Sequence, residues 1–401
     1  MDFIERIAAD PLVLLIPLFS AFVGWFTNVI AIKMMFYPTE FVGVKPFGWQ
    51  GIVPANARRL AKMSTQLILT KLLTLEELFA SFKGEEFAKE LDGVVAEITE
   101  QVVEEITKRA PQLWENAGEF MQNQVRENIA KEVRDLVIKI TDDFSANITE
   151  ILDLEQVVID AVEEDKELMS LMFLQVGSAE FRFIENSGIW FGFLFGLVQM
   201  VVWMYYPADY VLPAAGFFVG YATNWVALKL IFHPKEPRKI GPFVLQGVFH
   251  KRQREVSREF AKLTAGRVLN ADNITKTITT GPTVKKIFAI VEARVNEVID
   301  KYLQHPMAAM LVPEADREPL RAELLQRIRE ELPKEGGLLH TFAGKSVDIQ
   351  TELHERMEQL PPDEFEGVLR PAFQQDEWKL ILAGAALGFV AGVLQLVYVF
   401  S

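Results

Sequence analysis

The chain contains no cysteine, and this absence removes several classes of chemistry. Disulfides, thiolate nucleophiles and cysteine-ligated zinc or iron–sulfur sites are excluded. Histidine is scarce as well, because there are five residues and none of them forms a metal-ligand spacing such as H-E-x-x-H. A Gly-x-Ser-x-Gly elbow and a strand–glycine–helix phosphate loop are also missing. The sequence therefore predicts no catalytic residue, no metal, no cofactor and no enzymatic activity.

Basic residues are outnumbered, and the acidic excess is concentrated in part of the chain. The 401 residues carry a formal net charge of −14, although 50% of them are hydrophobic. Residues 84–170 alone hold 23 acidic and 8 basic side chains. A uniformly acidic soluble protein would not separate apolar from acidic stretches in this way. Acidic segments also disfavour nucleic acid as a partner, because binding to phosphates needs a basic surface.

Four long apolar runs dominate the sequence. A helix that crosses a bilayer needs about 20 predominantly apolar residues. Four segments meet or approach this length: Leu12–Ile32, Gly188–Tyr205, Val211–Phe232 and Leu380–Phe400. The second and third are separated by only a few residues, which predicts a tight transmembrane hairpin.

The polar segments between these runs have helical periodicity. Apolar residues recur every three or four positions along 87–106, 121–151 and 284–302. No alternating run predicts a β-strand. The expected fold class is an all-α membrane protein with four transmembrane helices and two amphipathic helical segments, which form antiparallel hairpins or small bundles.

One stretch occurs twice. The sequence FVGWFTNVIAIK at Phe22–Lys33 returns as FVGYATNWVALK at Phe218–Lys229, 196 residues later. Each copy opens a unit made of a span, a polar helical segment and a second span, so we predict a tandem two-helix repeat. Because each unit crosses twice, both units have the same orientation, and the expected axis runs along the membrane normal. The predicted segments are residues 1–54 (first span and motif), 55–187 (acidic cytoplasmic helical domain 1), 188–250 (transmembrane hairpin with the repeated motif), 251–378 (cytoplasmic helical domain 2) and 379–401 (fourth span).

Positive charges near the span ends predict the orientation. Lys33 and Arg58 follow the first span, and Lys229 and Arg238 follow the third. Lys and Arg are enriched on the cytoplasmic side of membrane proteins. We therefore expect both polar segments in the cytoplasm, with both termini and the hairpin on the other side.

The repeated pattern G-x-x-T-N-x-x-A-x-K, followed by F-x-P-x-E and by P-F with a later Q-G, is similar to that of a family of bacterial membrane proteins of unknown function, the YheB/YjiN type. The matching residues are Gly24, Thr27, Asn28, Ala31, Lys33, Phe36, Pro38 and Glu40, and Gly220, Thr223, Asn224, Ala227, Lys229, Phe232, Pro234 and Glu236. The second copy departs from the pattern by lacking the proline that the first has at Pro54. The resemblance is strongest over 22–62 and 218–260. It implies a location in the bacterial inner membrane and implies no activity.

The two Thr-Asn pairs are the candidate intramembrane polar site. Thr27-Asn28 and Thr223-Asn224 lie about 20–24 Å into their spans, in the cytoplasmic third of a core about 30 Å thick. One interpretation is structural: the amides bond to each other or to a neighbouring carbonyl and hold the helices together. The other is a polar site for an ion, a solute or a lipid headgroup at the repeat interface.

Lysines, glycines and basic helix starts complete the candidate residues. Lys33 and Lys229 are expected to extend to the cytoplasmic headgroups. Two rows of small residues predict close helix packing, either of one half on the other or of one chain on a second copy: Gly188, Gly192 and Gly196, and Gly384, Gly388 and Gly392. Basic residues just inside the membrane predict contacts with anionic lipid headgroups: Arg58, Arg59, Lys62, Lys251, Arg252, Arg254 and Arg258.

Two functions fit these features. In the first, the spans anchor helical domains that form a homo-oligomer or recruit cytoplasmic proteins, which makes the protein a scaffold. In the second, the twin Thr-Asn pairs line a passage in a transport or lipid-handling protein. Beyond the lipid bilayer and its anionic headgroups, the partner is not specified by the sequence.

Overall fold

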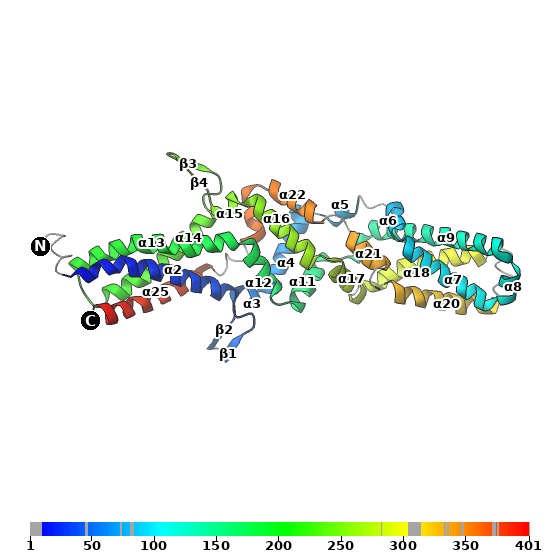
Figure 1. The fold of residues 1–401 in the computed structure, drawn as a ribbon, viewed down its shortest axis with the longest axis horizontal. Coiled ribbons are helices and arrows are strands. Elements are labelled where there is room, and N and C mark those ends of the chain that lie inside the picture. Colours follow the sequence, from blue (N-terminus) through cyan, green and yellow to red (C-terminus); the bar gives the residue numbers. More distant parts are fainter. Residues whose placement is uncertain are drawn as a thin grey trace. The chain divides into compact units, whose positions relative to one another are not determined.

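A computed structural model describes most of the chain, namely residues 10–44, 47–72, 74–80, 84–281, 283–303, 314–332, 334, 337–345, 349–370, 374 and 377–400. These residues are almost entirely helical. They divide into two compact units, and each unit draws on both halves of the chain (Figure 1). The first unit comprises Met1–Ile68, Val162–Leu263 and Leu353–Ser401; the second comprises Leu69–Ala161 and Thr264–Glu352.

The four predicted spans are present as helices in the first unit. They are α2 (Leu15–Phe36, preceded by the 3-10 turn η1, Pro11–Leu14), α13 (Ser178–Tyr205), α14 (Val211–Phe232) and α25 (Glu377–Val399). Each is long and apolar enough to cross a membrane. The second span starts at Ser178 rather than at Gly188, because the polar turns before the apolar run continue the same helix.

The four helices lie side by side, and α2 packs on α13 while α14 packs on α25 (Figure 1). A buried cluster joins the start of α2, the end of α13 and the start of α14: Val13, Ile16, Met200, Trp203, Met204, Val211 and Leu212. Leu396 and Phe400, at the end of the fourth span, pack against it. Both long polar segments therefore leave and re-enter the bundle at its opposite end.

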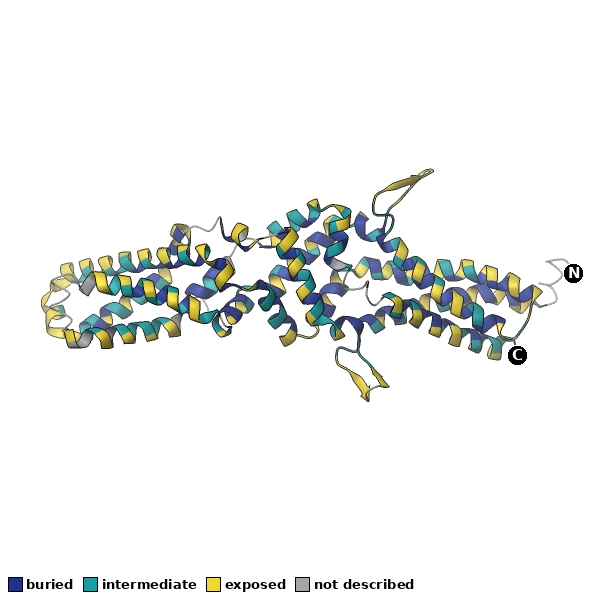
Figure 2. Cartoon of the chain, turned by 180° about the vertical axis from the view of Figure 1, so that it is seen from behind, coloured by how far each residue is buried: buried dark blue, intermediate teal, exposed yellow. Residues whose placement is uncertain are grey.

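The outer surface of this bundle is apolar. Leu18, Phe22, Phe218 and Phe389 are all exposed, while small and polar residues of the same helices are buried. Figure 2 shows this as exposed outer faces around a buried interior. Soluble proteins rarely expose continuous apolar surfaces of this kind, so the bundle has the surface of a membrane-embedded domain.

Two short β-hairpins follow the first and third spans, and the prediction of a strand-free chain is wrong here. Strands β1 (Val42–Val44) and β2 (Phe47–Trp49) pair antiparallel, as do β3 (Arg238–Ile240) and β4 (Phe243–Leu245). Three residues are too few to give a detectable alternation in sequence.

Short helices complete the first unit. The first hairpin leads into α3 (Ile52–Ala55), α4 (Ala57–Leu67) and the π-helical turn η2 (Ile68–Leu72). The second leads into α15 (Val248–Lys251), α16 (Gln253–Leu263) and η3 (Thr264–Val268), and these have the same lengths 196 residues later. At η2 and η3 the chain passes into the second unit, whose segments begin at Leu69 and Thr264. The remaining helices are α12 (Leu168–Val176), α22 (Ile349–Gln359) and α23 (Pro362–Leu369). Gln253 Nε2 donates to the last carbonyls of α22 and so caps that helix.

The second unit is built on four longer helices, α7 (Asp92–Arg109), α9 (Gly118–Ala146), α18 (Val284–Leu303) and α20 (Glu314–Glu331). Shorter helices surround them: α5 (Leu75–Ala80), α6 (Gly84–Glu90), α8 (Pro111–Asn116), α10 (Ile148–Ile151), α11 (Leu154–Glu164), α17 (Ala271–Thr280) and α21 (Leu338–Lys345). The Phe342 ring packs against the rings of Phe79, Phe87 and Phe144, with centroids 5.3, 6.1 and 5.6 Å away. The helix predicted from the apolar spacing of 284–302 is present as α18. The segment 87–106 is divided between α6 and α7 at Leu91, and the segment 121–151 is divided between α9 and α10 at Asn147, so neither forms one continuous helix.

Candidate functional site

The two Thr-Asn pairs lie inside the bundle. Thr27 and Asn28 are buried on α2, and Thr223 and Asn224 are buried on α14. Asn28 Nδ2 donates to the carbonyl of Ile184 at 2.6 Å, and Asn224 Nδ2 donates to the carbonyl of Leu380 at 2.9 Å. Each asparagine therefore donates a hydrogen bond to a backbone carbonyl of the second span in its own half.

The threonines bond within their own helices. Thr27 Oγ1 donates to the Gly24 carbonyl at 3.2 Å, and Thr223 Oγ1 donates to the Gly220 carbonyl at 3.3 Å. Each hydroxyl thus uses its single donor within its own helix. Only the asparagine of each pair therefore links two helices.

Glycine allows this link to form. A methyl group on Gly24 would overlap the Gly188 carbonyl, and one on Gly220 would overlap the Gly384 carbonyl. The other glycines of the two predicted rows pack in the same way. Gly192 and Gly196 of α13 contact α2, and Gly388 and Gly392 of α25 contact α14. Each row thus packs against the first span of its own half, which is neither of the two arrangements considered from the sequence.

The other atom of each asparagine amide is left without a partner. Asn28 Oδ1 and Asn224 Oδ1 are buried and accept no hydrogen bond from any described residue. Farther along the bundle, Ser20 Oγ donates to Gln199 Oε1 at 2.8 Å. Gln395 lies 196 residues after Gln199, but Gly216 stands at the position that corresponds to Ser20. The Nε2 of Gln395 has no hydrogen-bond partner within the described ranges. These two buried acceptors and this buried donor each lack a hydrogen-bond partner among the described residues.

The predicted lysines lie at the surface. Lys33 and Lys229 are exposed near the ends of α2 and α14. Lys229 Nζ lies 5.9 Å from the centre of the Trp225 ring. A lysine beside an exposed tryptophan one turn earlier is a common arrangement where a span meets the headgroup region.

Several of the basic helix-start residues are engaged in ion pairs. Arg58 Nε lies 2.7 Å from Glu163, and Arg254 Nε lies 3.0 Å from Glu358. Arg252 binds both carboxylate oxygens of the buried Glu180 at 2.7 Å, which ties α15 and α16 to the start of α13. The other predicted residues include Lys62, Lys251 and Arg258, which are exposed, and Arg59, which is half-buried. Arg252 therefore has a structural role, while Lys62, Lys251 and Arg258 lie at the surface.

A buried charged cluster that was not predicted lies beside the third span. Glu366 on α23 is buried and pairs with Lys235 at 3.0 Å and with Arg370. The His250 ring is buried 3.5 Å from the same carboxylate. Arg370 also lies over the Phe232 ring, 5.0 Å from its centre. Two cations around one buried carboxylate compensate its charge, so the cluster holds α23 against the base of α14.

The protonation of His250 follows from this setting. Burial lowers the pKa of His250 below its ordinary value of 6.5, and the nearby Lys235 ammonium lowers it further. The pKa of Asp363 is also lowered, because Lys235 bonds to and attracts its carboxylate. The histidine is therefore neutral and the Asp363 carboxylate is charged near neutral pH.

The repeat itself offered a signal for this cluster. At an offset of 196 residues, Lys235, His250, Glu366 and Arg370 correspond to Thr39, Pro54, Ser170 and Leu174. Four uncharged residues in one half are thus replaced by a set of ionisable residues in the other. Comparing the two halves for charge differences would have identified these positions, although not that they meet.

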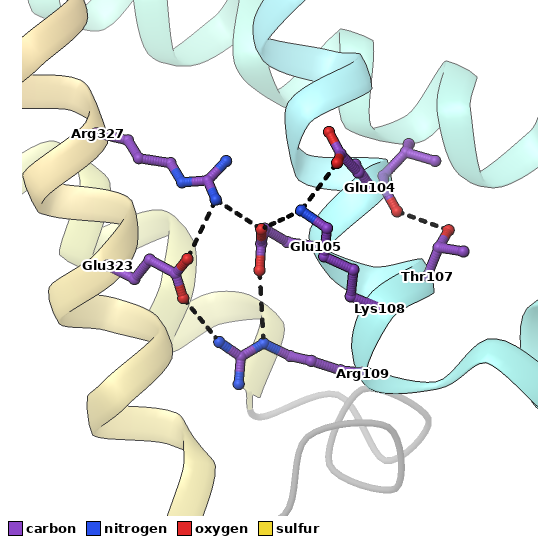
Figure 3. Close-up of polar contacts among 8 residues, drawn as sticks. Glu104, Glu105, Thr107, Lys108, Arg109, Glu323 and Arg327 are labelled. Carbon is purple, nitrogen blue, oxygen red and sulfur yellow. Dashed lines mark hydrogen bonds and ion pairs between the residues drawn. The ribbon is translucent and has the colours of Figure 1, made fainter.

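The second unit contains its own closed ring of ion pairs (Figure 3). Glu105 on α7 is buried and pairs with Arg327 of α20 at 2.7 Å and with Arg109 at 4.0 Å. Glu323 of α20 completes the ring, 3.0 Å from Arg109 and 3.1 Å from Arg327. Lys108 joins it at 3.4 Å from Glu105. Alternating charges compensate the buried carboxylate, which indicates a structural rather than a chemical role.

No group of three His, Asp or Glu side chains in the described part of the chain could hold a metal ion. The first unit instead presents an apolar four-helix bundle whose buried polar groups sit at helix contacts. This combination defines a helical membrane protein.

Comparison with known proteins gives the same class. Residues 19–141 match a family described as "Protein of unknown function (DUF445)". The chain is 31% identical over 140 residues to a UPF0754 membrane protein of Picosynechococcus sp., covering 28% of this chain and 34% of that protein. It is 45% identical over 67 residues to a UPF0754 membrane protein of Synechococcus sp., covering 16% of each. A third relative, from Synechococcus elongatus, is 30% identical over 130 residues and 31% of each chain is covered.

These matches span about a sixth to a third of the length of the curated relatives. No solved structure matches the chain. The predicted resemblance to a membrane-protein family of unknown function is confirmed. The family's description names no activity.

Proposed function

We propose that this protein is a non-enzymatic, multi-pass protein of the bacterial inner membrane that serves as a scaffold. Its four spans form the anchor, and its helical second unit binds a second copy or cytoplasmic partners. The proposal includes the tandem origin of the two halves and the cytoplasmic position of both polar segments. The positive charges that follow α2 and α14 support this orientation.

Equivalent contacts in the two halves support the tandem origin. The Asn28 amide reaches Ile184 and the Asn224 amide reaches Leu380, which are the same bond 196 residues apart. The side chains of Gln50 and Gln246 likewise donate to the carbonyls of Thr39 and Lys235. Equivalent bonds at equivalent positions are expected when one folded unit was copied and fused to itself.

The observation that carries the scaffold proposal is the use of both asparagine amides as helix-to-helix bonds. Each donates to a backbone carbonyl at the point where two glycines bring the helix backbones together. A span contact too close for a methyl group leaves little room for a solute to pass between the paired helices. The bundle is therefore built as a tight anchor.

The second unit supplies the surface for association. Its α9 is a helix of 29 residues with much of its length exposed. Ion pairs connect α9 and α10 to α18 at successive positions, Lys301–Glu132, Lys139–Glu297, Arg294–Asp143 and Lys286–Glu150. Helices α6 and α7 also pack on α9, so these contacts fix its inner side within the unit and leave its exposed residues available to a partner.

Disulfide crosslinking of the full chain in its native membrane tests the scaffold. Because the natural chain has no cysteine, single cysteines at exposed α9 positions such as Glu119 and Glu127 report only on contacts between copies. We expect crosslinked dimers from at least one exposed α9 position. Asp209→Cys, in the short connection between α13 and α14, serves as the control. Absence of crosslinking along all exposed α9 positions, together with no co-purifying protein at stoichiometric level, would remove the scaffold proposal.

The second candidate is a transport or lipid-handling protein. The buried and unpartnered Asn28 Oδ1 and Asn224 Oδ1 favour it, because a cation or a hydroxyl donor could satisfy them. Proteoliposomes containing the full chain would then show flux of an ion or solute. Replacing both asparagines by alanine would abolish that flux, whereas a scaffold shows no flux in either form.

A further inference from the structure

We propose that the β1–β2 hairpin is an interfacial membrane anchor. It lays one apolar face into the headgroup–acyl boundary of the leaflet at which α2 ends. The face consists of Val42, Val44, Phe47 and Trp49. The inference rests on the proposed insertion of the spans, and it concerns a surface that the scaffold role does not use.

The pairing register places these four side chains together. Val42 pairs with Trp49, and Val44 pairs with Phe47. Directly opposed residues of an antiparallel pair point to the same side, and so do residues two apart on one strand. The four described residues on this side of the hairpin are therefore all aliphatic or aromatic.

The other side of the hairpin is closed by the chain itself. Gly43 and Gly48 form the remaining pair, and the Phe41 ring packs over Gly48 where a side chain would otherwise lie. Gly43 has a φ of 126°, which strongly favours glycine. The hairpin thus has one face filled by Phe41 and one apolar face left open.

Three of the four side chains on the open face are strongly exposed in the protein alone, and Trp49 is half-buried. Val44 and Phe47 retain 80% and 85% of their accessible surface, and Val42 retains 63%. A two-stranded hairpin is at best marginally stable in water, and it needs an apolar layer against one face. The described residues of the first unit do not provide that layer.

The position of the hairpin identifies the bilayer as the missing layer. The first strand begins at Val42, shortly after α2 ends at Phe36, and the exposed Tyr37 and Phe41 lie between them. Figures 1 and 2 show both hairpins projecting sideways from the end of the bundle where the polar segments leave. The apolar face thus continues the lipid-facing surface of α2 into the interface, where aromatic side chains are favoured.

The second hairpin adds positive charge, which is the sign that anionic lipid headgroups attract. Arg238 and Lys239 on β3 are exposed, as are Val244 and Leu245 on β4. Basic and apolar residues side by side match the anionic headgroups and the acyl boundary of a cytoplasmic leaflet.

The test places an environment-sensitive fluorophore on a single cysteine, Val42→Cys, in the otherwise cysteine-free full chain. The protein is reconstituted in vesicles of phosphatidylcholine and phosphatidylglycerol, with nitroxide groups at a shallow or a deep acyl position. We expect a blue-shifted emission that the shallow nitroxide quenches more than either the deep nitroxide or aqueous iodide. Phe22→Cys on α2 should be quenched best by the deep nitroxide, and Glu119→Cys in the second unit by iodide.

A paired substitution sharpens the result. Phe47→Asp, made in the Val42→Cys chain, should shift the emission back to longer wavelength and restore quenching by iodide. Phe47→Leu should leave the emission and the quenching unchanged. Size-exclusion chromatography and retained deep quenching of a Phe22 probe confirm that both chains fold.

Each other outcome overturns the inference. A Val42 probe that behaves like the Glu119 probe shows that the hairpin lies in water. A blue shift without nitroxide quenching shows that a protein, either a second copy or another partner, covers the face. A Phe22 probe that stays in water defeats the membrane arrangement as well, whereas Phe22 in lipid with Val42 in water defeats the hairpin inference alone.

Discussion

Asn28 and Asn224 show how one polar side chain is accommodated in an apolar helix. Each amide donates one hydrogen bond through Nδ2, but its buried Oδ1 accepts none within the described part of the chain. The cost of burying that unpaired oxygen offsets part of the stabilisation from the donated bond. The carbonyl of Ile184 also accepts from Ser187 Oγ at 2.8 Å, so that it keeps a partner if the amide is lost. The structural value of the asparagine is therefore modest.

Replacing Asn28 by alanine should lower the stability of the purified protein by about 1 kcal/mol, the usual size of a hydrogen bond between membrane helices. Thr27→Val is the matched control, because the Thr27 hydroxyl bonds only to its own helix. Thermal unfolding in detergent gives the comparison. Equal losses from both substitutions would show that the interhelical bond is not what stabilises this position.

His250 predicts a pH dependence with a defined sign. Burial and Lys235 lower its pKa in the folded protein, so the unfolded chain binds the proton more readily. Stability should therefore be fully present above about pH 6.5 and be lost as the pH falls below it. Lys235, Asp363, Glu366 and His233 face or lie near this ring, so carboxylate protonation adds to the loss at lower pH.

His250→Gln isolates the contribution of the histidine. This variant keeps a neutral polar side chain, so its melting temperature should change less than that of the natural protein between pH 7 and pH 5, about the range over which a histidine titrates. His340→Gln, which removes a partly exposed ring beside Asp272 in the second unit, is the control. An unchanged slope in His250→Gln would mean that the ring is solvated in the folded protein.

At the scale of elements, the paired spans depend on backbone contact. Gly24→Ala places a methyl group against the Gly188 carbonyl and should destabilise the α2–α13 pair by about 1–3 kcal/mol, the range for overpacking a filled site. Gly93→Ala is the matched control, because nothing lies within 4 Å of the added methyl group on α7. That control should stabilise by about 0.5–1 kcal/mol. Thermal unfolding in detergent of both variants measures the difference.

The ion-pair ring between α7 and α20 is the equivalent element contact in the second unit. Glu105→Ala would leave Arg109 and Arg327 without their shared carboxylate. We expect a loss of about 1–2 kcal/mol, below the cost for a fully buried pair because both arginines are partly exposed. Glu104→Ala, which removes an exposed carboxylate paired only with Lys108, should have little effect. Hydrogen exchange of α20 amides distinguishes the two variants, since only the first should accelerate.

At the scale of the whole molecule, the chain is organised as two halves that share their framework and differ in charge. The spans α2 and α14, the hairpins and the helices as far as η2 and η3 recur with the same lengths, whereas α13 has 28 residues and α25 has 23. The cluster around Glu366 has no charged counterpart, since Ser170 occupies that place in the first half. The two halves therefore share these elements and differ in the charged groups at this position.

Side-specific labelling tests the proposed topology. Single cysteines at Asp209, between α13 and α14, and at Glu119, in the second unit, should react from opposite sides of the membrane. A membrane-impermeant maleimide applied to intact cells, after permeabilisation of the outer envelope, should label Asp209→Cys only. Labelling of Glu119→Cys from the outside would reverse the orientation, and labelling of both from one side would contradict four crossings.

The sequence by itself determined the spans and the repeated positions. A run of about 20 apolar residues has one stable form in a bilayer, a helix that bonds its own backbone. The periodic segments at 87–106, 121–151 and 284–302 were likewise determined locally, because a helical stripe depends on spacing alone. The identity of Asn28 and Asn224 as candidate residues followed from their repetition.

Only the tertiary structure decided which groups meet. The carbonyls of Ile184 and Leu380 carry no sequence signal, because every residue has one, so the partners of the asparagines could not be read from the chain. The spacing of the glycine rows does not say which helix they contact, and in the structure they contact α2 and α14. The cluster of Lys235, His250, Glu366 and Arg370 comes from distant segments, and the exposed face of β1–β2 depends on a register only three residues long. Periodicity is a property of neighbours along the chain, whereas these features depend on contacts between segments that the chain does not place side by side.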